Sequence, residues 1–298
     1  MQLGRILTAM ATPFTADGKL DLYGAQKLAV YLIDHGSEGL VVAGTTGESP
    51  ALTHNEKLEL FKAVKTAVGD RVPVIANTGM NSTAASIELS REAEALGVDG
   101  FMLVVPYYNR PSQEGLYRHF KAIAEATTLP IILYNIPSRT GCNMNVDTVL
   151  RLAAIDNIVG IKEASGNLDQ ATAILQQAPD EFLLYSGDDL LTLPLMAIGA
   201  RGVISAAANV VGQEMQAMVT AFVNGDVLEA AKLHQELFPI FKALFISTNP
   251  VPLKTALQIM GLPGGPVRLP LVGLNSSERE IVATVMKEAG LVLDNQCC

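Results

Sequence analysis

The 298-residue sequence is poor in cysteine and contains no tryptophan. Its three cysteines, Cys142, Cys297 and Cys298, are odd in number and two of them are adjacent, so they cannot supply a disulfide framework. This usage indicates a reducing compartment, and we expect a cytoplasmic protein. We interpret Cys142 as a small residue packed near a loop, in preference to a reactive thiol.

Basic residues are scarce, since 21 of them face 30 acidic residues and the net charge is −9. Nucleic acid and anionic membranes are therefore poor partners. No apolar run approaches the roughly 20 residues that span a bilayer. The beginning, MQLGRILTAMATPF, is interrupted by Pro13 and predicts a first strand, not a signal peptide. The four histidines show no metal-ligand spacing, so no metal site is expected.

Apolar material is abundant, at 49% of the residues, and it can fill a complete core. Eight apolar, β-rich runs recur at residues 7–14, 39–44, 72–78, 100–106, 130–137, 158–165, 182–188 and 202–209. They are continuous and do not alternate with polar residues. Such runs are typical of parallel strands that are covered on both faces.

Helical patterns fill the gaps between these runs. Their expected N-terminal caps are Asp21, the capping box of Thr53 with Glu56, Ser82 or Thr83, Ser112, Asn145 and Asn167. Eight strand–helix units predict an α/β fold, a (β/α)8 TIM barrel in preference to an open sheet. We expect residues 1–225 to form the catalytic barrel. Residues 226–298, with three helical stretches and no strand, would form a C-terminal helical extension packed on it.

Active sites of such barrels lie at the carboxyl ends of the strands, and Lys162 lies there inside the run IVGIKEAS. In a strand covered on both faces its ammonium must be desolvated or paired. A neutral amine produced by desolvation is the nucleophile that forms a Schiff base with a carbonyl. The alternatives are an ion pair with Glu163 and a side chain that extends to the barrel mouth.

Three further groups follow neighbouring strands. Tyr134 is expected at the depth of Lys162, where a phenol can relay protons, although core tyrosines are common. The turn carrying Thr45 and Thr46 offers hydroxyls and N–H groups for a carboxylate, but an ordinary tight turn would look similar. Arg139 suits a second carboxylate, with simple solvation as the alternative.

Five motifs stand in order after the expected strands, namely GTTGE (44–48), YYNRPS (107–112), YNIPSRTG (134–141), GIKEASGN (160–167) and SGDD (186–189). With them the chain resembles the dihydrodipicolinate synthase family. That family belongs to the pyruvate-dependent class I aldolases, which include N-acetylneuraminate lyase. The resemblance runs from the first strand through NPVPLKTAL (249–257) to about Leu291.

The resemblance implies that Lys162 forms an imine with pyruvate and that Tyr134 acts as general acid and base. Thr45 would link Tyr134 to Tyr108, which crosses from the neighbouring subunit. A homo-oligomer is then expected, a tetramer built of dimers that share Tyr108. The imine forms with the substrate itself, so no cofactor is implied.

The resemblance also implies the substrate contacts. Thr46 would hold the pyruvate carboxylate, Ile204 would present a backbone carbonyl near the nucleophile, and Arg139 would bind the carboxylate of L-aspartate 4-semialdehyde. The product would be 4-hydroxy-tetrahydrodipicolinate, a precursor of diaminopimelate and lysine. Sialic-acid lyases carry an apolar residue at the position of Arg139, which favours the synthase.

Two alternatives to the synthase remain at this point: another pyruvate-dependent lyase, and a silent keto-acid-binding paralogue. A barrel that binds pyridoxal phosphate through Lys162 is disfavoured, because Asp188 and Asp189 stand where such a barrel would place a phosphate loop.

The resemblance bears on regulation as well. Feedback-inhibited members bind lysine at a subunit interface, and the corresponding positions here are Ser49, Pro50, His54, Lys57, Asn81, Ala85 and Tyr107. Those members carry histidine at the position of Lys57 and glutamate at that of Ala85. Because lysine would lose an acidic partner and meet an extra cation, we expect weak inhibition or none.

Overall fold

Eight parallel strands close into a barrel in the computed structural model, which describes residues 3–292. The strands are β1 (Ile6–Ala9), β2 (Leu40–Val42), β3 (Val74–Asn77), β4 (Gly100–Val104), β5 (Ile131–Asn135), β6 (Ile158–Glu163), β7 (Leu183–Ser186) and β8 (Gly202–Ser205). They follow one another around the ring in chain order, and β8 pairs with β1 to close it. The predicted (β/α)8 barrel is confirmed.

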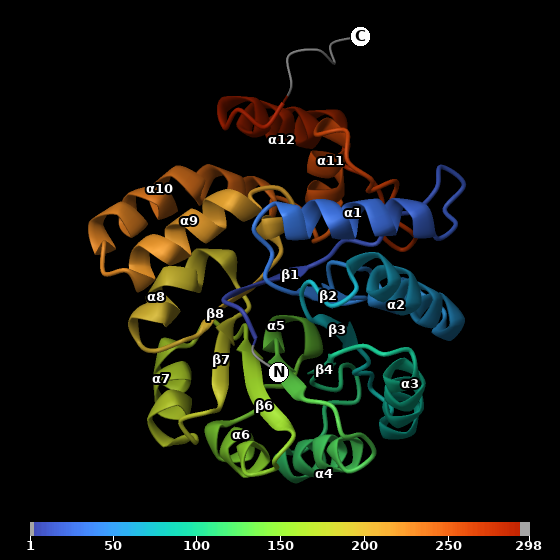
Figure 1. Cartoon of the computed structure of the whole chain (residues 1–298), viewed down its shortest axis with the longest axis vertical. Helices are drawn as coiled ribbons and strands as arrows, with labels where there is room; N and C mark the ends of the chain where they lie inside the picture. Colours follow the sequence, from blue (N-terminus) through green and yellow to red (C-terminus); the bar gives the residue numbers. More distant parts are fainter. Residues whose placement is uncertain (1–2, 293–298) are drawn as a thin grey trace.

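Helices surround the ring, as Figure 1 shows. They are α1 (Leu22–Asp34), α2 (His54–Val68), α3 (Thr83–Ala95), α4 (Gln113–Ala124), α5 (Pro137–Thr140), α6 (Val146–Ala153), α7 (Leu168–Gln177), α8 (Thr192–Ala197) and α9 (Gly212–Val223). Short 3-10 turns η1 (Ser49–Ala51), η2 (Asp189–Leu191) and η3 (Ala207–Asn209) follow three of the strands. The short helix α5 directly follows β5 and, unlike the others, lies inside the ring of helices in Figure 1.

The caps predicted from sequence define most helix starts. Thr53 and Glu56 form the reciprocal capping box of α2, while the Asp21 carboxylate accepts the N–H of Gly24 at the start of α1. Ser82, Ser112 and Asn167 cap three further helices. Asn145 precedes α6 as expected, yet its side chain makes no capping bond and instead accepts from Asn143.

Most strands are shorter than the apolar runs that predicted them. The run 7–14 contains β1, which ends at Ala9, and the run 39–44 contains β2, which ends at Val42. Residues just beyond these ends, such as Met10 and Ala43, are buried although they lie outside the strands, and Met10 still donates its backbone N–H to the carbonyl of Val41. Hydropathy reports burial and not strand pairing, so it extended the strands into the barrel mouth.

Two apolar layers lie on the two faces of the sheet. The inner layer fills the barrel and consists of Leu3, Leu7, Ala9, Val41, Ile75, Met102, Ile132, Tyr134, Tyr185 and Ile204. The outer layer packs the strands against the helices and includes Phe61, Phe101 and Phe120. Burial on both faces explains the continuous apolar runs, and it places any inward-pointing polar side chain at the carboxyl ends of the strands.

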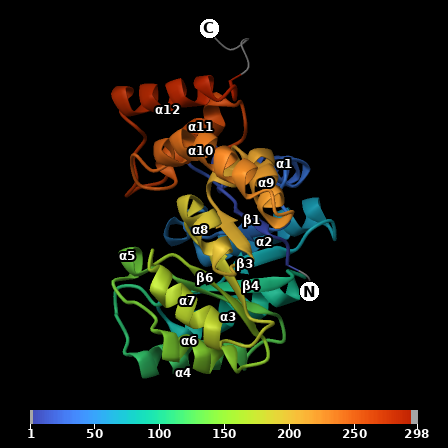
Figure 2. The ribbon, with the colours of Figure 1, turned by 90° about the vertical axis from the view of Figure 1, so that its left-hand side faces the viewer.

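Three more helices follow α9, namely α10 (Val227–Ala243), α11 (Val251–Ile259) and α12 (Ser276–Glu288). They gather at one end of the molecule, with α12 outermost (Figures 1 and 2). Helix α10 begins after its N-cap Asp226 and packs along α9. The division into a barrel of residues 1–225 and an extension of residues 226–298 remains a prediction.

Of the three cysteines, Cys142 lies among the described residues. Cys142 is a half-buried free thiol whose Sγ lies 3.4 Å from the carbonyl oxygen of Pro111, while Cys297 and Cys298 lie outside the described residues. Between residues 3 and 292 no helix is long and apolar enough to cross a membrane.

Candidate active site

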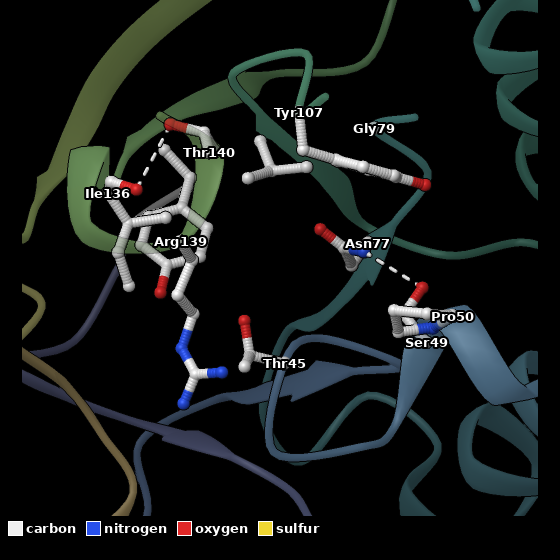
Figure 3. Close-up of a pocket in the computed structure, with 11 residues that line it drawn as sticks. Thr45, Ser49, Pro50, Asn77, Gly79, Tyr107, Ile136, Arg139 and Thr140 are labelled. Atoms are coloured by element: carbon white, nitrogen blue, oxygen red, sulfur yellow. Dashed lines mark hydrogen bonds between the residues drawn. The ribbon is translucent and has the colours of Figure 1, made fainter. Parts of the chain in front are cut away.

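A cavity of about 240 Å³ opens at the carboxyl ends of the strands (Figure 3). Its lining includes Thr45, Ser49, Pro50, Asn77, Gly79, Val104, Tyr107, Tyr134, Ile136, Arg139 and Thr140. The cavity therefore brings together three of the predicted site residues: Thr45 from the turn after β2, Tyr134 from β5 and Arg139 from α5. It also contains three positions of the expected lysine pocket, Ser49, Pro50 and Tyr107.

Lys162 is buried in the barrel interior on β6, directly opposite Tyr134 of β5 in the sheet register. The residue is only 5% exposed, and its Nζ lies 4.5 Å from the centre of the Tyr134 ring. Within residues 3–292 this amine has no hydrogen-bond acceptor and no ion pair. A buried amine without an acceptor or a counter-ion in contact gives up its proton more readily, and the neutral form is the nucleophile.

The ion pair with Glu163 considered from sequence does not form. The Glu163 carboxylate accepts from the amides of Asn135 and Gln170 and from the N–H of Ser165. It is fully engaged on the other side of the strand, because neighbouring residues of a strand point to opposite faces. Lys162 is left to the barrel interior.

Burial lowers the pKa of Lys162 to about 8. The negative charge of Asp189 opposes this shift, and the positive charge of Arg139 adds to it. A lysine with this pKa is mostly protonated at pH 7. The free energy needed to remove its proton is nevertheless far smaller than for an exposed lysine. The site therefore provides a usable fraction of neutral amine near neutral pH.

Tyr134 is almost fully buried, and this burial raises its pKa above the usual value. The hydroxyl of Thr45 and the guanidinium of Arg139 act in the opposite direction, because both stabilise the phenolate. Arg139, on α5, extends into the cavity toward Thr45 (Figure 3). The phenol thus has both a hydroxyl and a cation near it, an arrangement that supports proton transfer.

Backbone strain is concentrated at this end of the barrel. In the described chain, four residues other than glycine have a positive φ: Ala43 and Glu48 after β2, and Tyr108 and Arg110 after β4. Such conformations cost of order 1–3 kcal/mol each and persist where the surrounding structure holds them. Both strained loops flank the cavity.

The remaining predicted residues lie close to the cavity without lining it. Thr46 is buried in the turn that also carries Thr45, and Ile204 lies in the barrel interior on β8. Tyr108 is 91% exposed, whereas its neighbour Tyr107 lines the cavity. Within residues 3–292, no group of three or more His, Cys, Asp or Glu side chains is arranged to hold a metal ion.

The sequence analysis missed the position of Asp189 in the site. It considered this residue only as a poor neighbour for phosphate. The carboxyl group is buried, accepts the hydroxyl of Ser205 at 2.5 Å and accepts the N–H of Ala207 at 3.0 Å. Burial raises its pKa to about 6, although both hydrogen bonds and the charge of Lys162 oppose that shift. The available signal was the acidic pair in SGDD immediately after β7.

Comparisons with known proteins agree with this geometry. The chain matches the model of the dihydrodipicolinate synthetase family over residues 2–289. It is 74% identical over 292 residues to the 4-hydroxy-tetrahydrodipicolinate synthase of Moorella thermoacetica, covering 98% of this chain and 100% of that protein. It is 55% identical over 292 residues to the synthase of Desulforudis audaxviator, covering 98% and 99%.

Solved structures show the same similarity. A dihydrodipicolinate synthase from Bacillus anthracis superimposes with a TM-score of 0.95 at 52% identity, covering 96% of this chain and 98% of that one. A synthase from Cyanidioschyzon merolae, solved with lysine bound, gives a TM-score of 0.96 at 47% identity, covering 97% and 99%.

A TIM barrel with a buried amine at the carboxyl ends of its strands defines a lyase of the class I aldolase type. Within this class, the matched family model and the high identities identify the relationship more closely. The chain belongs to the dihydrodipicolinate synthetase family.

Proposed function

We propose that this chain condenses pyruvate with L-aspartate 4-semialdehyde to give 4-hydroxy-tetrahydrodipicolinate, in the biosynthesis of diaminopimelate and lysine. The observation that carries the proposal is the buried amine of Lys162, without an acceptor in the described residues and facing Tyr134. The curated synthases at 74% and 55% identity support the same activity.

In the first step the neutral amine of Lys162 attacks the keto carbon of pyruvate. Loss of the carbonyl oxygen as water gives the imine, and Tyr134 supplies and removes the protons with Thr45 beside it. Thr46 binds the pyruvate carboxylate, and the backbone carbonyl of Ile204 lies beside the nucleophile. The substrate forms the imine directly, so the reaction requires no separate cofactor.

In the second step the imine loses a methyl proton and becomes an enamine, whose carbon attacks the aldehyde. Arg139 holds the carboxylate of the semialdehyde, which is a bidentate partner for a guanidinium. The amino group of the semialdehyde then replaces the Lys162 nitrogen on the former keto carbon. This exchange closes the ring and restores the free lysine.

We further propose that Tyr108 completes the proton relay of a neighbouring subunit, in a homotetramer built of dimers in the cytoplasm. Its 91% exposure and its strained φ of 73° support an outward role in a defined position. One solved neighbour, 40% identical, is described as a monomeric variant, so the oligomeric state must be measured. Mixing a Lys162 variant with a Tyr108 variant should restore partial activity if the site is shared.

A coupled assay with pyruvate tests the second substrate. L-aspartate 4-semialdehyde, N-acetylmannosamine and simple aldehydes are compared at matched concentrations, and borohydride trapping locates the pyruvate adduct by peptide mass. Turnover with the semialdehyde and an adduct on Lys162 are expected. Preference for N-acetylmannosamine would indicate a sialic-acid lyase, and an adduct without turnover would indicate a silent paralogue.

A further inference from the structure

The C-terminal extension contacts the turn after β2 through a buried hydrogen bond. The side-chain amide of Asn249, just before α11, donates to the Oγ1 of Thr46 at 3.0 Å, and both residues are buried. Because the Thr46 oxygen accepts this bond, its own proton is free to be donated elsewhere. Within residues 3–292 that proton has no acceptor.

The same turn ends at Glu48, whose φ of 55° lies in the left-handed region that non-glycine residues rarely adopt. Its buried carboxylate accepts from the Nζ of Lys254 at 2.8 Å and from the backbone N–H of Arg268 at 2.9 Å. Lys254 also donates to the carbonyl of Pro266 at 2.6 Å. Two groups of the extension therefore hold the strained end of the turn.

Arg268 extends this contact to the start of α2. Its guanidinium donates to the Glu56 carboxylate at 2.6 Å and to the Ala51 carbonyl at 2.9 Å. These contacts join residues more than 200 positions apart in the sequence, as the separations of 203 for Asn249 and 220 for Arg268 show. The turn is therefore fixed from outside the barrel at Thr46 and at Glu48.

We propose that Asn249, together with the pair of Lys254 and Glu48, positions the Thr45–Thr46 turn so that the Thr46 hydroxyl points its proton at the substrate carboxylate. This inference rests on the proposed function, because it assigns the turn to pyruvate. Asn249 is then a positioning residue that acts through Thr46. The pyruvate site is complete only when the extension is docked.

The test reverses the polarity of one hydrogen bond. Asn249→Asp keeps the side-chain shape but replaces the donor with an acceptor, so the Thr46 proton is drawn away from the substrate. The full-length variant is treated with borohydride over a range of pyruvate concentrations. We expect the pyruvate concentration at half-saturation to rise by about 10- to 150-fold, the loss expected for a hydrogen bond to a charged group.

Two companion variants separate the mechanism from its alternatives. In a Thr46→Val background the hydroxyl is absent, so Asn249→Asp should add little further loss. A penalty of equal size in that background would show that the new charge acts directly and would refute the inference. Asn275→Ala removes the N-cap of α12 in the same extension, far from Thr46. It should lower the melting temperature and leave pyruvate saturation unchanged.

The adduct formed by the wild-type protein separates failure of this inference from failure of the proposed function. Failure of the wild type to form any adduct on Lys162 would contradict the proposed function and the inference that rests on it. A normal wild-type adduct with unchanged half-saturation in Asn249→Asp would contradict the inference alone. An equal rise in Asn275→Ala would mean that docking stability, not the Thr46 contact, controls the site.

Discussion

Two buried lysines of this chain share several properties and differ in one. Lys162 is 5% exposed and Lys254 is 1% exposed, burial lowers the pKa of each to about 8, and each amine lies near an aromatic ring. Lys254 donates to Glu48 and to the carbonyl of Pro266, whereas Lys162 has no acceptor in the described chain. A lowered pKa alone therefore does not identify a nucleophile. A nucleophilic amine must also be free of acceptors and ion pairs and lie beside a cavity.

The largest expected effect separates these two lysines. Lys162→Ala should abolish borohydride-trappable pyruvate, because no arginine can replace the amine as a nucleophile. Lys254→Ala leaves Glu48 buried without its cation, so it should cost about 3–5 kcal/mol of unfolding free energy. Its folded fraction should still form an adduct on Lys162. Peptide mass after trapping, together with thermal denaturation, measures both effects. An adduct on Lys254 in the Lys162→Ala variant would break the distinction.

Tyr134 sharpens the comparison, because Lys254 has Phe14 where Lys162 has a phenol. Tyr134→Phe keeps the ring over the amine but removes the proton carrier, so turnover should fall by about 10²- to 10⁴-fold. Pyruvate binding should be retained. Steady-state kcat and pyruvate saturation measured on one preparation check this, and a loss of binding without a loss of kcat would assign the hydroxyl to ground-state contact.

A substitution of Arg139 tests whether its positive charge binds the semialdehyde, lowers the pKa of Lys162, or does both. Arg139→Leu should raise the KM for the semialdehyde roughly 10- to 150-fold, with little change in the KM for pyruvate. Its charge also lowers the pKa of Lys162, so the variant should need a higher pH for imine formation. Separate titration of the two substrates measures the first effect. Equal changes in both KM values would indicate that Arg139 organises the cavity.

A substitution of Asp189 tests how a negative charge near Lys162 affects the pKa of that lysine. Its carboxylate raises the pKa of Lys162, so Asp189→Asn should lower that pKa and move the pH midpoint of adduct formation downward, by about one unit. The matched control is Asp188→Asn, which removes the adjacent carboxylate that accepts from the N–H of Leu190. A midpoint that stays in place in both variants would restrict Asp189 to holding Ser205 and Ala207.

The smallest expected effect is the inhibition by added lysine. It concerns Lys57, a third buried lysine. Its Nζ contacts only the sulfur of Met80, at 3.9 Å, among the described residues, and burial lowers its pKa. Lys57 is therefore buried and does not lie on a solvated face of α2. Because the chain carries Ala85 where the resemblance expects an acid, we still predict weak lysine inhibition or none. Half-inhibition below about a millimolar at saturating pyruvate would contradict this.

Much of the fold could be predicted from sequence, because burial on both faces of a parallel sheet produces continuous apolar runs and because caps such as Thr53 with Glu56 act locally. Lys162 could be identified for the same reason, as a charge inside such a run. The contact of Asn249 with Thr46 could not, since 203 residues separate them and neither belongs to a periodic pattern. Glu48 was read as the end of a turn motif, and its burial with Lys254 depends on the docked extension.

The long separation between Glu48 and Arg268 also sets a time for the site during synthesis. Chains grow at about 5–20 residues per second, so the 220 residues between them take roughly 11 to 44 s to make. All eight strands, which end at Ser205, are made before α11 begins at Val251. During this interval a nascent barrel can close while the turn after β2 still lacks the groups that hold it. If the proposed role of Asn249 holds, synthesis of the segment 249–268 therefore decides when the pyruvate site is complete.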